Sequence, residues 1–157
     1  MRITAKVDYA VRACVELAAA TTEPGVRSDP VKGHDIAAAQ DIPVKFLENI
    51  LSELKRSGIV ASRRGAEGGY WLARAPSEVS VADIIRAVEG PLADVRGVRP
   101  DQLDFGPDLE SLQRMWIAMR ANLRTVLEAV TLASLRDHKL PDAVESLAND
   151  PEAWSAH

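Results

Sequence analysis

The stretch SRRGAEGGY occupies residues 62–70 and decides the fold that we expect for this chain. It places two arginines and three glycines between two short runs, 59–62 and 70–72, that are rich in β-branched or aromatic residues. Such runs favour strands, and glycine allows the tight turn that joins them into a hairpin. A phosphate-binding P-loop would end in Gly-Lys-Ser/Thr, whereas this loop ends in Gly-Gly-Tyr. We therefore expect the basic hairpin of a winged helix, with arginines that can enter a DNA groove.

A helix-turn-helix pattern lies directly upstream of the hairpin. Residues 34–42 begin with a carboxylate in the first turn, and the helix must stop before Pro43, because the residue before a proline is driven out of helical geometry. Pro43 suits the first position of the next helix, and Gly58 supplies its C-terminal stop. Between them, apolar residues recur at spacings of three and four, which indicates one buried face. These residues are Phe46, Leu47, Ile50, Leu51 and Leu54.

The opposite, polar face of this second helix is the predicted recognition surface for DNA. Asn can bridge adenine, Glu can accept from the cytosine amino group, and Lys can reach guanine or phosphate. A merely solvated face would show the same pattern, and the neighbouring basic hairpin is what favours DNA. The predicted DNA-binding residues are Lys45, Glu48, Asn49, Ser52, Lys55, Arg56, Arg63, Arg64 and Gly65.

Several segments carry a family resemblance in their order and spacing: residues 1–6 (MRITAK), 8–12 (DYAVR), 36–60, 64–65 and 68–70. Together they resemble the Rrf2 family of bacterial winged-helix transcription regulators, which includes iron–sulfur cluster and nitric-oxide sensing repressors. The likeness is close over about residues 1–90 and extends to the rest in layout only. It implies a mainly α fold with a small β-hairpin wing, that is, a winged helix-turn-helix plus a long dimerisation helix.

The same resemblance implies how the protein would bind. It implies a homodimer on a double-stranded DNA operator with two half-sites. The family's base-contacting positions fall on Lys45, Glu48 and Asn49, and the arginine that enters the minor groove falls on Arg64. We predict a repressor of this kind.

The chain departs from the family in its metal ligands. Cluster-bearing members carry three closely spaced cysteines after the fourth helix, whereas residues 92–107 read LADVRGVRPDQLDFGP. The resemblance places Asp8 where some members supply a carboxylate ligand, but a carboxylate without thiolates cannot hold a usual cluster. We therefore expect Asp8 to cap or pair locally, and we expect no metal and no cofactor. The three histidines are far apart in the sequence and show no metal-ligand spacing.

The single cysteine, Cys14, shares an apolar helical face with Val7, Ala10, Val11 and Ala18. This position favours a small buried side chain. A redox-sensing thiol would need exposure and a nearby positive charge, which the sequence does not clearly provide.

The second half of the chain offers a dimerisation helix. Ser80 and Asp83 resemble a capping box, and the helix that they open closes at Gly90. Residues 91–107 form a long loop, which is where we would look for a small-molecule effector; the sequence leaves open whether one binds. From Asp108 an apolar stripe then follows a heptad spacing. Its members are Leu109, Leu112, Trp116, Met119, Leu123, Val126 and Val130.

Periodicity alone fits a stripe that packs on its own domain as well as one that pairs with a second copy. The family layout, in which a long helix crosses its symmetry mate, favours dimerisation. Beyond the stripe we expect a short helix capped by Thr131, and then a weakly ordered tail with one amphipathic turn at Val144 and Leu147. The predicted divisions are a DNA-binding domain at 1–90, a loop at 91–107, dimerisation helices at 108–140 and a tail at 141–157.

Composition agrees with a compact cytoplasmic regulator. The chain has 157 residues and a hydrophobic fraction of 46%, with no run of membrane-spanning length and no signal-peptide layout. The net charge is −4, and the acidic excess lies in the second half of the chain. Residues 43–75, by contrast, carry six basic and three acidic residues. DNA affinity depends on this local excess more than on the total. No catalytic motif predicts an enzyme; the alternative is a winged-helix protein-interaction module that does not bind DNA.

Overall fold

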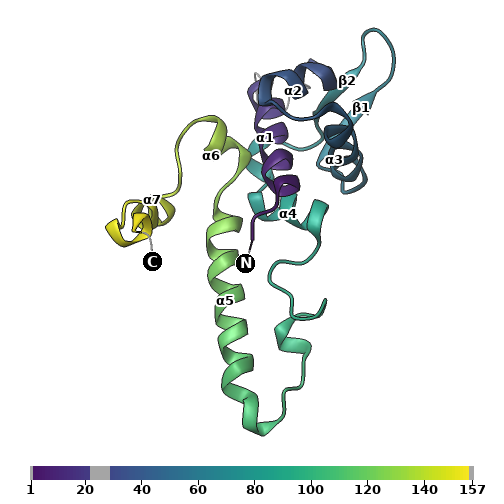
Figure 1. The fold of residues 1–157 in the computed structure, drawn as a ribbon. Helices are drawn as coiled ribbons and strands as arrows, with labels where there is room; N and C mark the ends of the chain where they lie inside the picture. Colours follow the sequence, from purple (N-terminus) through teal and green to yellow (C-terminus); the bar gives the residue numbers. More distant parts are fainter. Residues whose placement is uncertain (1, 22–28, 156–157) are drawn as a thin grey trace.

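The computed structural model describes residues 2–21 and 29–155 and is mainly helical with one small hairpin, as the sequence predicted (Figure 1). Met1 and His157 lie outside the described residues. Figure 1 shows α1 to α4 and the hairpin gathered in one head, from which a long helix extends. The elements are α1 (Ala5–Ala19), α2 (Gly33–Gln40), α3 (Val44–Arg56), β1 (Val60–Arg63), β2 (Gly69–Leu72), α4 (Val81–Glu89), α5 (Glu110–Ala129), α6 (Leu132–Arg136) and α7 (Asp142–Ala148), with short 3₁₀ turns at Pro76–Glu78, Pro100–Gln102, Pro107–Leu109 and Pro151–Trp154.

The turn between α2 and α3 differs from the prediction by one residue. Asp41 adopts a left-handed conformation with φ 51°, which ends α2. Pro43 has an extended ψ of 126° and is the N-cap of α3, so it does not occupy the first helical position as expected. Its carbonyl already accepts hydrogen bonds from the amides of Phe46 and Leu47 at 2.9 and 3.0 Å. The helix therefore begins at Val44, while its end before Gly58, with φ +75°, is as predicted.

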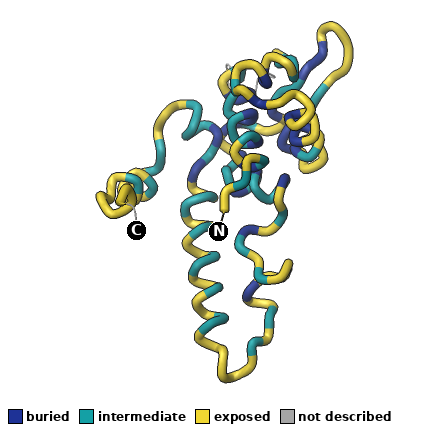
Figure 2. Tube along the Cα trace, viewed as in Figure 1, coloured by how far each residue is buried: buried dark blue, intermediate teal, exposed yellow. Residues whose placement is uncertain are grey.

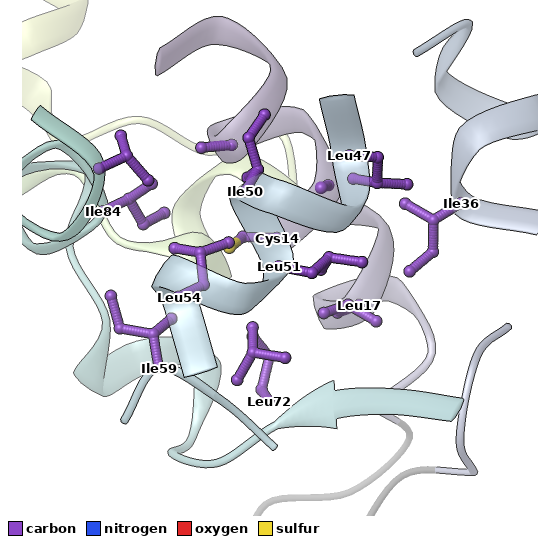
Figure 3. Close-up of a cluster of buried hydrophobic side chains, with 14 of the residues drawn as sticks. Cys14, Leu17, Ile36, Leu47, Ile50, Leu51, Leu54, Ile59, Leu72 and Ile84 are labelled. Carbon is purple, nitrogen blue, oxygen red and sulfur yellow. The ribbon is translucent and has the colours of Figure 1, made fainter. Parts of the chain in front are cut away.

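The core of the head forms where α3 meets α1. Leu47, Ile50, Leu51 and Leu54 of α3 are at most 1% exposed, and Figure 3 shows them around Cys14 of α1. The prediction was wrong for Phe46, which is 41% exposed. Its ring meets Tyr9 edge to face at 5.7 Å between centroids, at the border of the core. Helical periodicity places a residue at such a border without deciding how far the neighbouring helix covers it.

The hairpin β1–β2, with its connecting loop, is called the wing below (residues 60–72). Its strands are antiparallel, with Val60 opposite Leu72 and Arg63 opposite Gly69. Val31, on the connection between α1 and α2, adds a bridge to Tyr70 through two backbone hydrogen bonds of 2.9 and 2.8 Å. The base of the wing is thereby fixed to the head.

The second half of the chain joins the head at two places. Ser80 and Asp83 form the predicted capping box at the start of α4. Just after the C-terminal end of α5, Leu132 of α6 is completely buried in the core of the head, where α6 packs on α1. Thr131 caps α6 as predicted, by accepting a hydrogen bond from the amide of Ser134.

Residues 91–107 run beside α5 in the opposite direction (Figure 1). Two of these residues, Leu92 and Pro100, are buried. The side chains of Gln113 and Arg120 on α5 donate to the backbone carbonyls of Pro100 and Leu92 at 3.0 and 3.2 Å. This loop is therefore held against the helix at two places, near Leu92 and near Pro100.

The C-terminal segment is more ordered than expected. Instead of one amphipathic turn, it forms the seven-residue helix α7 and a 3₁₀ turn that ends at Trp154. The indole of Trp154 donates to the carbonyl of Ala148 at 2.6 Å, although the residue as a whole is 81% exposed. In the described part of the chain, no helix combines the length and apolar character that crossing a membrane requires.

Candidate nucleic-acid interface

The polar face of α3 is open to solvent along its whole length. All six of its predicted DNA-binding residues are exposed, because the four buried leucine and isoleucine side chains lie on the opposite side of the helix. The exposed six are Lys45, Glu48, Asn49, Ser52, Lys55 and Arg56.

Two grooves flank this face. The first, of about 430 Å³, lies between α3, the start of α2 and the wing, and we call it the wing groove. The second, of about 360 Å³, lies on the α1 side of α3. Ser52 lines both grooves and therefore marks the crest between them. Glu48 and Lys55 line the wing groove, whereas Asn49 and Arg56 line the other.

The wing is connected to α3 by a side-chain hydrogen bond. The ammonium of Lys55 lies 2.8 Å from the hydroxyl of Ser62 on β1. A second link follows from the backbone, because the amide of Ile59, directly before β1, donates to the carbonyl of Leu54 on α3 at 3.0 Å. Helix and hairpin are thus held as one surface.

The two wing arginines differ in what they already bind. Arg63 ends β1, and its guanidinium donates to the carbonyl of Glu67 across the loop at 2.7 Å. Arg64 follows in the loop, is exposed, and has no hydrogen bond or ion pair to any residue that the structure describes. Gly65 next to it has φ +102°, a conformation that favours glycine. Arg64 is therefore the free cation at the wing.

Among the residues that line the wing groove, Lys32 and His34 at the start of α2 were not predicted from the sequence. Lys32 and His34 lie about thirty residues before the wing, so spacing along the chain gives no sign of the encounter. The lining of the groove is cationic, because it contains four basic side chains and one carboxylate, that of Glu48. The basic residues are Lys32, Lys55, Arg63 and Arg64. Such a patch attracts the phosphate backbone of nucleic acids.

Cys14 and Asp8 occupy the environments that the sequence predicted. Cys14 is completely buried, and burial raises the pKa of its thiol to about 12. Asp8 is exposed and pairs with Arg12 one turn later, at 3.2 Å. No group of three or more His, Cys, Asp or Glu side chains in residues 2–21 and 29–155 is arranged to hold a metal ion.

Comparison with known proteins agrees with this geometry. The family model described as Rrf2, iron-dependent transcriptional regulator, matches residues 3–138. The chain belongs to the Rrf2 family. A Mycobacterium tuberculosis protein named as an HTH-type transcriptional regulator is 45% identical over 153 residues, which cover 98% of this chain and 92% of that protein.

Solved structures of two Rrf2-type regulators share the fold. The structure of CymR, the global cysteine regulator of Bacillus subtilis, has a TM-score of 0.71 at 31% identity, covering 88% of this chain and 98% of that one. The structure of IscR from T. potens has a TM-score of 0.65 at 30% identity, covering 100% and 93%. This Rrf2 chain is accordingly a DNA-binding transcriptional regulator with a winged helix-turn-helix, and not an enzyme.

The side chains present do not fit the iron that the family's description implies. The chain has one cysteine, and its thiol lies in the apolar core with a raised pKa, so the thiolate that ligates iron is disfavoured.

Proposed function

We propose that this Rrf2 regulator is a homodimeric repressor that binds a DNA operator with two half-sites. In each half-site α3 lies in the major groove, where Lys45, Glu48 and Asn49 contact bases, and Arg64 enters the adjacent minor groove. Ser52, Lys55, Arg56, Arg63 and Gly65 complete the surface by contacts to the phosphate backbone. Repression follows if such an operator overlaps a promoter, because the bound dimer then occupies the site of transcription initiation.

The observation that carries this proposal is the free cation of Arg64 beside an uncovered polar helix face. A helix face with six exposed polar residues is common on protein surfaces. A rigidly attached hairpin that presents an unpaired arginine next to that face is the arrangement of winged-helix DNA binding. The cationic lining of the wing groove supports the same orientation on DNA.

The apolar side of α5 supports a homodimer. None of the twenty residues of α5, all of them described, is buried within the chain. The stripe residue Leu109, the N-cap of α5, is 49% exposed, and Met115 and Ile117, which lie outside the predicted stripe, are 46% and 40% exposed. A long amphipathic helix with an uncovered apolar stripe gains stability by pairing that stripe with another helix. The stripe residues that remain partly exposed are Leu112, Trp116, Met119, Leu123 and Val126.

Val130 does not belong to this proposed surface. It caps the end of α5 in an extended conformation, is 6% exposed, and its carbonyl accepts a hydrogen bond from the amide of Val81 at 2.9 Å. These contacts hold it inside its own chain, so the dimer surface that we propose ends at Val126.

A cavity of about 190 Å³ is where we place a small-molecule effector. It lies where residues 91–94 meet the start of α1, the end of α4 and Leu127 of α5. Its walls are mostly apolar, with Arg2, Glu89 and Asp94 among its polar lining. A ligand there would touch both the head and the dimer helix. Filling the cavity with Ile85→Trp should abolish any thermal stabilisation that a compound library produces on the wild type.

The experiment that tests the function is selection of bound duplexes from random-sequence DNA by the purified protein. We expect enrichment of a motif with two related half-sites, and a complex of two chains per duplex by sedimentation. Enrichment of a single half-site would contradict the dimer. If no sequence were enriched over the starting pool, the protein-interaction alternative would replace the proposal.

A further inference from the structure

The connection between α1 and α2 places a lysine against the wing in a position that no feature of the sequence revealed. Lys32 directly follows Val31, whose backbone pairs with Tyr70 at the base of the wing. From there the Lys32 ammonium donates to the carbonyl of Ala66 and, at 3.4 Å, to the carbonyl of Gly65. The side chain thus spans from the base of the wing to its loop.

Lys32 is poorly suited to its place in the local secondary structure. It is the N-cap of α2, because its carbonyl accepts from the amides of Asp35 and Ile36, yet its side chain makes no capping hydrogen bond. N-caps favour Ser, Thr, Asp or Asn, and a positive charge at a helix N-terminus is unfavourable. A residue that disfavours the helix that it caps indicates a role outside that helix.

The wing itself needs such an external contact. Its strands have four residues each, and a two-stranded hairpin of this size is marginal on its own. The Val31–Tyr70 bridge holds the base. Within the loop 64–68, all of which the structure describes, a single backbone hydrogen bond joins the amide of Gly68 to the carbonyl of Gly65 at 3.0 Å. Lys32 donates to that same Gly65 carbonyl, and so fixes the peptide group between Gly65 and Ala66, one residue beyond Arg64.

We propose that Lys32 is a positioning residue for the wing: its ammonium holds the loop carbonyls of Gly65 and Ala66, and thereby sets where Arg64 meets DNA. This inference rests on the proposed function of Arg64. Lys32 is half-buried and already bonded to the loop, whereas Arg64 is exposed and free among the described residues. Lys32 therefore acts through the wing, and a direct contact between its ammonium and a DNA phosphate is the competing explanation.

The first test needs no DNA. In Lys32→Met the side chain keeps its length and loses its donor, whereas Lys32→Arg keeps donors; Lys139→Met removes an exposed lysine remote from the wing. The ¹⁵N heteronuclear NOE of the Gly65, Ala66 and Gly68 amides should fall in Lys32→Met, with the amides of α3 unchanged. Lys32→Arg and Lys139→Met should resemble the wild type. Unchanged loop order in Lys32→Met would overturn the proposal.

The second test is a double-mutant cycle on the duplex selected by the wild-type protein. Lys32→Met should weaken binding about tenfold, within the range expected for losing an arginine contact. In the Arg64→Ala background, Lys32→Met should weaken DNA binding by no more than about a further twofold, since the residue through which Lys32 acts is gone. Its addition should also leave the salt dependence of Arg64→Ala unchanged.

A phosphate contact gives the opposite result. The two losses would then multiply, and the slope of log K against log salt would fall by about 0.9 when Lys32→Met is added. That outcome would overturn the positioning role. If no duplex were selected, the function proposed for Arg64 would fail, while the loop order measured in the free protein would still decide whether Lys32 holds the wing.

Discussion

The head and the long helix α5 use their apolar residues in different ways. In the head, Leu17, Leu51 and Leu54 are completely buried, and Figure 2 shows the buried residues concentrated there. Along α5 the trace alternates between exposed and partly buried residues, and none is buried (Figure 2). Most helical stability in proteins comes from packing an apolar face. The head therefore carries its own stabilisation, whereas α5 would gain part of its stabilisation from the partner helix of the dimer that we propose.

The two regions are joined by polar contacts as well as by Leu132. Arg86 on α4 pairs with Glu128 on α5, and Arg124 pairs with the same carboxylate at 2.9 Å. This group lies at the end of α5 nearest the head. It is where a change in the position of the long helix would reach α4.

The largest effect should come from charging the α5 stripe. In the double variant Met119→Glu, Leu123→Glu, unpaired carboxylates would lie in the proposed dimer contact, where desolvation is costly. Monomers should result by sedimentation, with DNA binding weakened by about 100-fold or more, because avidity between half-sites is lost. Ala121→Glu with Thr125→Glu adds the same charge at exposed positions of α5 and should stay dimeric. A charged-stripe variant that remains a dimer would show that the stripe serves the chain's own fold.

Truncating one leucine in each region should sharpen the contrast. Leu54→Ala removes a completely buried side chain from the head and should lower the free energy of unfolding by about 2–5 kcal/mol. This loss should be independent of protein concentration. Leu123→Ala should instead cause a loss of stability whose size depends on protein concentration and is largest where the wild type is dimeric and the variant is not, because it weakens association. Equal, concentration-independent losses at both positions would remove the distinction between the regions.

Arg64→Ala should leave both regions folded and change only DNA binding. Loss of an arginine inserted in a groove should weaken specific binding by about 1–3 kcal/mol and reduce the salt slope by about one. Arg114→Ala removes an exposed arginine from α5 and serves as the matched control. Titration of both variants against the selected duplex at fixed salt measures the difference. Equal binding by Arg64→Ala and wild type would show that the wing does not read DNA.

The contribution of the Arg86–Glu128–Arg124 ion-pair group to stability should depend on pH. Hydrogen bonds from Arg124 and then Arg86 lower the pKa of Glu128 from 4.5 to about 2. Because the folded pKa is depressed, the stabilisation is complete above about pH 4.5 and is lost as pH falls through about 2. The stability difference between wild type and Glu128→Gln should therefore shrink across that window, with Glu110→Gln as a control. A carboxyl titration of Glu128 by NMR with a midpoint near 4.5 would contradict the ion-pair group.

Iron should have the smallest effect, namely none. The thiol of Cys14 is buried and its pKa is raised to about 12, so it offers no thiolate at neutral pH. Anaerobic incubation with iron and sulfide should give no bound iron and no visible absorbance after desalting. Stoichiometric iron with visible bands that disappear in Cys14→Ser would make this protein a cluster-binding sensor after all.

Local signals predicted the elements and most of their ends. The Gly58 stop, the Ser80–Asp83 capping box and the Thr131 cap are all present, because each depends on residues within one turn of the helix end. The buried face of α3 was also predicted, apart from Phe46. Pro43 was misplaced by one residue, since a proline is compatible with both the N-cap and the first helical position. The α7 helix was underestimated because its seven residues carry a weak apolar pattern.

By itself, the sequence determined the family, the helix-turn-helix and the basic wing, since these depend on residue types at short spacings. Only the tertiary structure decided which polar residues share a groove and that Val130 lies inside its own chain. It also showed that Arg63 is bonded, whereas Arg64 has no partner among the residues that the structure describes. It alone placed Lys32 on the wing loop, across more than thirty residues of chain. Contacts of this kind depend on how helices pack, and packing is decided by the whole core rather than by neighbouring residues.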